Sequence, residues 1–178
     1  MAYCLQNLAG IALDCDTSMG GIKTVYIANY GDVAGIAYAE TDGVKGQISG
    51  ITMADGKTFK AYQFRKGTSN MTSTLTADET TGLNFVTTEV NLVFTKMDTA
   101  KRVELSALSI GQLAVIVLDS NGKYWYCTPD DYAAASAGGA ETGTAKGDRN
   151  AFTLTLKAEN ITYPIELAEG VIDTVIAK

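Results

Sequence analysis

The chain has 178 residues, enough for one domain with a sizeable hydrophobic core, and its 46% apolar content excludes wholesale disorder. Fourteen lysine and arginine residues against twenty aspartate and glutamate residues give a formal charge of −6. Such a chain does not attract phosphate, which argues against a dedicated DNA-binding protein. The chain contains no histidine, so histidine-based catalytic triads and histidine-ligated zinc sites are excluded.

Neither a membrane span nor a secretion signal is expected. No apolar run approaches the roughly 20 residues that a membrane-spanning helix needs, and no basic leader precedes the first apolar residues. The cysteines, Cys4, Cys15 and Cys127, are odd in number and lack CxxC spacing. We therefore expect reduced, buried cysteines in a protein made in the cytoplasm.

Alternation of apolar and polar residues with a period of two runs through most of the chain and predicts a mainly β fold. Residues 22–28 are β-branched and aromatic and predict the first strand. Residues 45–53 and 58–66 flank Asp55-Gly56, a strong turn signal, so we expect them to pair as a hairpin. Residues 70–76 alternate weakly and predict a strand that ends in a polar turn.

Residues 83–96 predict an unusually long strand, which would span about 45 Å. Thr87, Glu89 and Asn91 fall on one face of this strand. The other face is mainly apolar and carries Val86, Thr88, Val90, Leu92 and Phe94. A strand with one mostly polar face indicates an extended sheet that is open to water on one side.

One helix is predicted after this strand. Asp98 is a favourable N-cap for a helix over residues 99–109, and Gly111 is placed to end it. The short apolar run 112–118 then predicts a strand buried on both faces. Asn121-Gly122 predicts a second hairpin, which returns the chain into a strand at 123–127.

Residues 129–150 are rich in alanine, glycine, serine and aspartate and show no periodicity, so we expect a long functional loop. Residues 152–156 alternate as a strand, and the tail 161–178 ends in alternating apolar residues. No linker or repeat divides the chain. The prediction is one domain, 1–178, a β-sandwich or partly open β-barrel with one flanking α-helix at about 98–109.

The acidic clusters do not predict a catalytic site or a metal site. Asp14 with Asp16, and Asp130 with Asp131, are paired carboxylates, but catalytic carboxylates need partners from other strands, and surface loops are the favoured interpretation. Asp119 opens a segment that looks like a calcium loop, yet a strand follows where further ligands would be needed.

The aromatic cluster Tyr124, Trp125 and Tyr126 could stack on a sugar or a base, but packing in the core is favoured. Glycine pairs lack the spacing of a phosphate-binding loop. We therefore expect no catalytic site, no cofactor site and no metal site, and we do not expect an enzyme.

Several stretches, in a consistent order, resemble a family of tail tube proteins from phages and prophages of gut Bacteroidetes. They are GGIKTVYIANYGDV near residue 20, FKAYQFRKGTSNMT from Phe59, VNLVFTKMDTAKRVEL from Val90, LAVIVLDSNGKYWYC from Leu113 and TGTAKGDRNAFTLTL from Thr142. The resemblance implies a structural virion protein with a β-sandwich or partly open barrel and one helix. Six copies would form a ring, and stacked rings would form a tube through which the genome passes.

The resemblance also implies partners and surfaces. The partners would be further copies of the chain and other tail proteins, with DNA as non-specific cargo, in a virion tail made in the host bacterial cytoplasm. The polar face with Thr87, Glu89 and Asn91 would line the channel. The loop would contact the next ring through Asp130, Asp131, Tyr132, Lys146, Asp148 and Arg149.

Two other classes of protein stay open at this point. A tail terminator or a head decoration protein would have a similar β-sandwich. A carbohydrate-binding module would use Tyr124, Trp125 or Tyr126 as a stacking platform.

Overall fold

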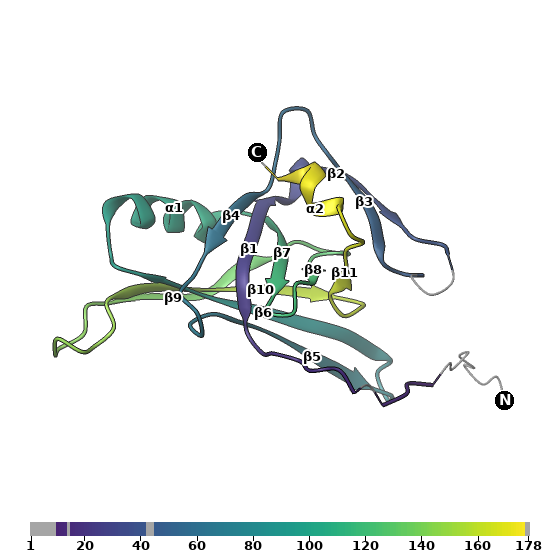
Figure 1. The fold of residues 1–178 in the computed structure, drawn as a ribbon, viewed down its shortest axis with the longest axis horizontal. Coiled ribbons are helices and arrows are strands. Elements are labelled where there is room, and N and C mark those ends of the chain that lie inside the picture. Colours follow the sequence, from purple (N-terminus) through teal and green to yellow (C-terminus); the bar gives the residue numbers. More distant parts are fainter. Residues whose placement is uncertain (1–9, 14, 42–44, 177–178) are drawn as a thin grey trace.

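The computed structural model describes residues 10–13, 15–41 and 45–176. The protein is mainly β, with 49% of residues in strands and 12% in helices. Antiparallel strands form three sheets, and the two larger sheets pack face to face without closing into a barrel in the described part of the chain (Figure 1). The predicted mainly β fold is confirmed.

A five-stranded sheet forms the middle layer, with the spatial order β11 (Ile165–Glu166), β8 (Tyr124–Tyr126), β7 (Leu113–Asp119), β1 (Ile22–Asn29) and β4 (Lys60–Gln63). A four-stranded sheet packs on one face of it, in the order β5 (Asn70–Asp78), β6 (Leu83–Thr95), β10 (Ala151–Asn160) and β9 (Ala134–Glu141). The other face is covered by the hairpin of β2 (Val33–Tyr38) and β3 (Ile48–Met53), together with the short helix α2 (Val171–Val175).

Two hydrophobic cores separate these three layers. The first lies between the two large sheets and includes Val25, Val90, Leu92, Val115 and Leu156. The second lies beneath the β2–β3 hairpin and α2 and includes Ile48, Phe59, Ile116, Tyr126 and Val175. Strand β7 contributes to both cores, because successive side chains of a strand point to opposite faces. The predicted strand buried on both faces is therefore confirmed.

The long strand has the predicted faces. Val86, Thr88, Val90 and Leu92 of β6 are buried, whereas Glu89 lies exposed on the opposite face. Thr88 is polar but satisfied, since its hydroxyl lies 2.9 Å from that of Ser73 on β5.

Helix α1 (Thr99–Ile110) follows β6 within one residue of the predicted range. Asp98 is its N-cap, because the Asp98 carboxylate accepts a 2.8 Å hydrogen bond from the backbone N–H of Lys101. Of its residues, only Leu108 is buried.

The first predicted hairpin is wrong and the second is right. Gly56 has the expected positive φ of 69°, but β3 pairs with β2, and β4 pairs with β1 of the middle sheet. The reason is burial: Phe59 enters the second core and its N–H bonds to the carbonyl of Val175, so the chain crosses into another layer at the turn. Strands β7 and β8 do pair across Asn121-Gly122.

The predicted loop at 129–150 is wrong over its middle. Residues Ala134–Glu141 form β9, which pairs with β10, so the predicted loop is reduced to a short segment before β9 and to residues 142–150 after it. The period-two pattern is missing there because alanine, glycine and serine lie on both faces of this edge strand. The expectation of a single helix also fails, since Val171, Ile172 and Val175 are buried as one turn of α2.

Leu92 and Leu83 of the same strand allow a matched test of the core. Leu92 is 0% exposed and Leu83 is 51% exposed. Leu92→Ala should lower the free energy of unfolding by about 2–5 kcal/mol, because it leaves a cavity between the sheets. Leu83→Ala should change it by less than about 0.5 kcal/mol. Urea unfolding of the free subunit measures both, and equal effects would contradict this packing.

Candidate assembly surfaces

The residues predicted to face a channel lie on the outer face of the four-stranded sheet. Asn91 links three strands of this face: its amide donates to the Asn70 side-chain oxygen over 3.3 Å, and it accepts from the Thr155 hydroxyl over 2.7 Å. Thr87 is half-buried next to Glu89, in a shallow depression of about 260 Å³ that is otherwise lined mainly by threonines. The face is therefore wetted and mostly uncharged.

Lys157 is the lysine of this face and stands opposite Glu89 in the sheet. Its ammonium group lies 2.6 Å from the carboxylate of Glu159. The hydrogen bond to Glu159 and the charge of that group raise the pKa of Lys157, and the charge of Glu89 adds to the effect. Two carboxylates thus flank the positive charge, which weakens any attraction for a passing phosphate.

The two outer strands of this sheet have free edges in the described part of the chain. β5 pairs only with β6, and β9 pairs only with β10. These strands are 9 and 8 residues long, and neither contains proline, lysine or arginine. Long edges without such residues are a template for pairing with another chain. By contrast, the middle sheet ends in β11 and β4, of 2 and 4 residues.

The residues predicted to form one inter-ring loop lie at two ends of the sheet. Asp130, Asp131 and Tyr132 precede β9, whereas Lys146, Asp148 and Arg149 follow it, and β9 separates the two groups. Because β9 is extended over 8 residues, about 25 Å of strand separates them. The prediction of a single contact loop is therefore corrected to two separate groups.

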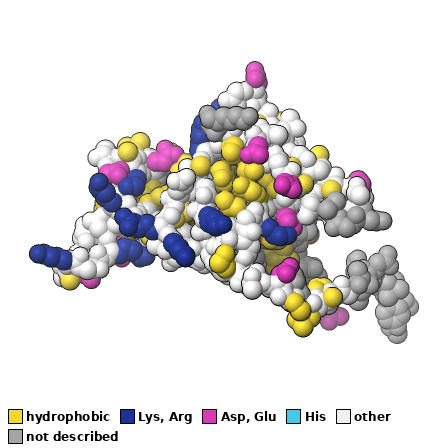
Figure 2. Space-filling model, in the orientation of Figure 1, with side chains coloured by type: hydrophobic (Ala, Val, Ile, Leu, Met, Phe, Trp, Pro, Cys, Tyr) yellow, Lys and Arg dark blue, Asp and Glu magenta, His cyan; other side chains and the backbone are white. Residues whose placement is uncertain are grey.

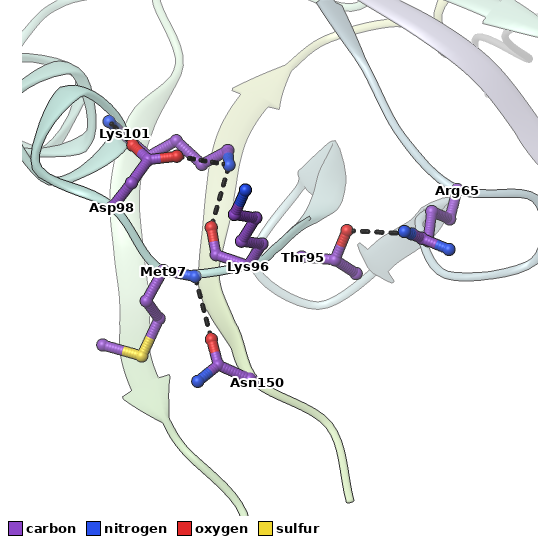
Figure 3. A network of polar contacts seen from close by, with 7 residues as sticks. All are labelled: Arg65, Thr95, Lys96, Met97, Asp98, Lys101 and Asn150. Atoms are coloured by element: carbon purple, nitrogen blue, oxygen red, sulfur yellow. Dashed lines mark hydrogen bonds and ion pairs between the residues drawn. The ribbon is translucent and has the colours of Figure 1, made fainter. Parts of the chain in front are cut away.

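A polar network fixes the end of the sheet at which β6 turns into α1 (Figure 3). Lys96 has a φ of 65°, and its carbonyl accepts a 2.8 Å hydrogen bond from the Lys101 ammonium group. The N–H of Met97 donates to the Asn150 side chain over 2.8 Å, which ties the β9–β10 connection to this turn. Arg65 donates to the Thr95 hydroxyl over 3.1 Å. Three connections of the four-stranded sheet thus meet here.

Helix α1 has a second apolar stripe that faces solvent. Ala100, Val103, Ala107 and Ile110 recur at helical spacing and are all exposed, while Leu105 and Leu108 pack against the first core. Ile110 is 87% exposed. An apolar helix face of this kind is typical of a protein–protein contact.

The N-terminal arm carries further exposed apolar side chains, Ile11 and Leu13, and extends away from the sandwich at the end opposite α1 (Figure 1). Its base is fixed by Asn121, whose side-chain oxygen accepts from the N–H of Met19 over 2.8 Å and whose amide donates to the Met19 carbonyl over 3.1 Å. Exposed apolar groups therefore lie at both ends of the molecule.

The aromatic cluster does not form a stacking platform. Tyr126 is buried in the second core, and Tyr124 packs against Tyr26 with 6.1 Å between ring centres. Trp125 is half-buried and its indole N–H donates to Asp119 over 3.0 Å. The other oxygen of Asp119 accepts from the N–H groups of Asn121 and Lys123. Core packing and a hairpin turn, as favoured from the sequence, are confirmed.

The remaining candidate groups are structural or lie outside the described residues. Asp130 accepts from the N–H of Ile161, and Asp131 from that of Tyr132, so both order surface loops as expected. Cys127 is buried, and burial raises the pKa of its thiol. Cys15 is exposed, so its predicted burial is wrong, because it belongs to the arm. Cys4 and Asp14 lie outside the described residues. No group of histidine, cysteine, aspartate and glutamate side chains in the described ranges could hold a metal ion.

No protein-family model, no curated protein and no solved structure matches the chain. None of the described helices is long and apolar enough to cross a membrane. The class of protein is therefore inferred from these surfaces together with the sequence resemblance.

The β9–β10 connection offers a test by limited proteolysis. Lys146 is exposed, whereas the Arg149 side chain is held by Glu141. Trypsin should therefore cut the free subunit first at Lys146, and assembly should protect this bond. Lys146→Gln identifies the site by removing the first cut. Mass spectrometry of the fragments measures cleavage in both states. Equal cleavage of the free and the assembled protein would show that this connection lies outside the contacts between subunits.

Proposed function

We propose that the protein is a structural subunit of a phage tail tube, which assembles into stacked, hexameric rings around a channel for DNA. It would then be located in the virion tail after synthesis in the bacterial cytoplasm, with other copies of itself and other tail proteins as partners. The observation that carries the proposal is the four-stranded sheet with two long free edges and a polar outer face. The sequence resemblance gives the class of assembly.

The two free edges support a ring because they differ in amino-acid composition, which favours pairing of one edge with the other edge of the next copy. β5 is rich in threonine, and β9 consists of alanine, glycine and serine up to its final glutamate. Pairing of β5 of one copy with β9 of the next is a head-to-tail contact, which closes into a ring when the rotation between copies closes. Small side chains on β9 let a second backbone approach. Pairing would also remove both aggregation-prone edges.

The polar face supports a channel. A sheet that continues from copy to copy presents the same face all round the ring, and this face carries threonine and asparagine with a single flanked lysine. A weakly acidic, hydroxyl-rich wall does not bind the phosphates of DNA and allows the genome to slide. DNA would thus be cargo and not a specific ligand.

The exposed apolar groups support extended assembly. Val103 and Ile110 of α1 lie at one end of the molecule, and the arm with Ile11 and Leu13 leaves at the other. When subunits contact one another head-to-tail, the α1 end of one subunit meets the arm of the next, so each contact can bury both apolar groups. A tail terminator would form rings that do not stack, and a head decoration protein would form no tube, so tube formation distinguishes the proposed function from these alternatives.

The first test of the proposal is assembly itself. The full chain should form rings or tubes that bury more than about 2,000 Å² per contact, as judged by light scattering over a concentration series and by electron microscopy. Ala137→Lys in β9 should prevent ring closure, because an edge lysine blocks strand pairing. Ala61→Lys makes the same change on the edge strand β4 and should assemble normally. A strict monomer up to millimolar concentration would contradict the proposal.

The second test is a charge reversal on the polar face. Glu89→Lys would change each six-membered ring by about twelve charges. Because Glu89 is exposed, the free energy of unfolding should change by less than about 0.5 kcal/mol. Tubes of this variant should retain DNA at low salt and release it at high salt, unlike tubes of the unchanged protein.

Glu169→Lys is the matched control, because Glu169 is exposed next to α2, on the far side of the sandwich. Tubes of this control should not retain DNA. If Glu89→Lys tubes form and retain no more DNA than the control, the four-stranded sheet does not line the channel.

A further inference from the structure

The charges of the four-stranded sheet are separated along its strands. Since the strands are antiparallel, β5 begins, β6 ends, and β9 and β10 are connected at one end of the sheet. The opposite end holds the β5–β6 turn, the segment before β9 and the segment after β10. Each end therefore gathers three chain segments that are distant in sequence.

The first end is basic. Residues 65–69, 95–102 and 141–150 meet there through the contacts of Arg65 with Thr95 and of Asn150 with Met97. They carry seven basic residues against the three carboxylates of Asp98, Glu141 and Asp148; the seven are Arg65, Lys66, Lys96, Lys101, Arg102, Lys146 and Arg149. Half of the fourteen lysine and arginine residues of an acidic protein are thus concentrated at one end of one sheet.

The second end is acidic. Residues 78–83, 129–133 and 159–163 contain five carboxylates and no lysine or arginine; the five are Asp78, Glu79, Asp130, Asp131 and Glu159. Of these, Glu159 is paired with Lys157 of β10, so the other four carry the excess of negative charge. No basic residue occurs between Gly67 and Thr95, which includes the whole β5–β6 hairpin. In the view of Figure 2, most of the lysine and arginine side chains lie toward the end that carries α1, and most of the carboxylates lie toward the other end.

The basic and acidic residues are separated along the strands, and this direction decides which contact between subunits the charges can stabilise. In a ring closed by pairing of β5 with β9, the strands lie side by side around the ring and run, with some tilt, from one rim to the other. The basic end of every subunit then lies on one rim, and the acidic end on the other. Six copies repeat each excess of charge around the whole rim.

We propose that rings of this protein stack head-to-tail, with the acidic rim formed by Glu79 and Asp131 docking on the basic rim formed by Lys66 and Lys146 of the next ring. This inference rests on the proposed ring and names the partner of its two rims as a second copy of the same ring. Complementary charge gives the stack a polarity, because basic on basic and acidic on acidic contacts repel. The two groups separated by β9 are the two halves of this contact.

Neutralising either rim should weaken stacking and leave the rings intact. Lys66→Glu/Lys146→Glu removes the net positive charge of the basic rim, and Glu79→Lys/Asp131→Lys removes most of the negative charge of the acidic rim; all four residues are exposed. In each variant the concentration at which tubes form should rise more than about tenfold. Lys45→Glu and Glu169→Lys change exposed residues outside these segments and should leave stacking unchanged.

Mixing the two rim variants gives a sharper result. The Lys66→Glu/Lys146→Glu variant keeps its acidic rim, and the Glu79→Lys/Asp131→Lys variant keeps its basic rim, so these two rims can still dock. The remaining rim of each variant has lost most of its net charge. The mixture should therefore form paired rings and not tubes, as seen by electron microscopy and analytical ultracentrifugation. Tubes of the unchanged protein should also shorten as salt rises from roughly 0.05 to 1 M.

Failure of this inference is distinguishable from failure of the ring. If rings form but stacking is insensitive to salt and to all four rim substitutions, the charge contact is overturned and the ring stands. If the unchanged chain forms no rings, the proposed function fails, and the contact is then tested between single subunits of the two variants at low salt. Absence of a mixed dimer by light scattering there would overturn the inference as well.

Discussion

Strand β7 is buried on both faces, and the arrangement of all three layers depends on it. Val115 and Val117 face the four-stranded sheet, and Ala114 and Ile116 face the β2–β3 hairpin and α2. A strand buried on both faces has to satisfy its backbone groups by pairing on both sides, which β1 and β8 provide. The four-stranded sheet is therefore held through one face only, and its other face and its edges are left for other contacts.

This asymmetry connects the fold to the proposed assembly. The middle sheet ends in very short strands, while the four-stranded sheet ends in long strands that contain no lysine, arginine or proline. A soluble monomer normally protects such edges with charge, proline or a covering element. In the proposed ring each edge is covered by the next copy. The same pairing brings six polar faces inward and aligns the two charged ends of the strands with the two rims.

The sequence predicted those elements whose signals are local and strong. The long strand β6 shows apolar side chains at every second position, the N-cap Asp98 marks the start of α1, and Asn121-Gly122 marks the turn between β7 and β8. The polar face with Thr87, Glu89 and Asn91 follows from the same alternation. Strand β9 could not be found this way, because alanine, glycine and serine give no contrast between its faces. This strand forms because its backbone pairs with β10, and the local sequence has no preference that predicts it.

The sequence by itself determined the class of fold, the length and faces of the central strands, and the excess of acidic over basic residues. Only the tertiary structure decided which strands pair, as the separation of β3 from β4 shows: burial of Phe59 in the second core outweighs the local preference of Asp55-Gly56 for a hairpin. It also decided where charges gather. Arg65, Lys96 and Arg149 are far apart in the chain, and they meet because antiparallel pairing brings alternate connections to the same end of a sheet.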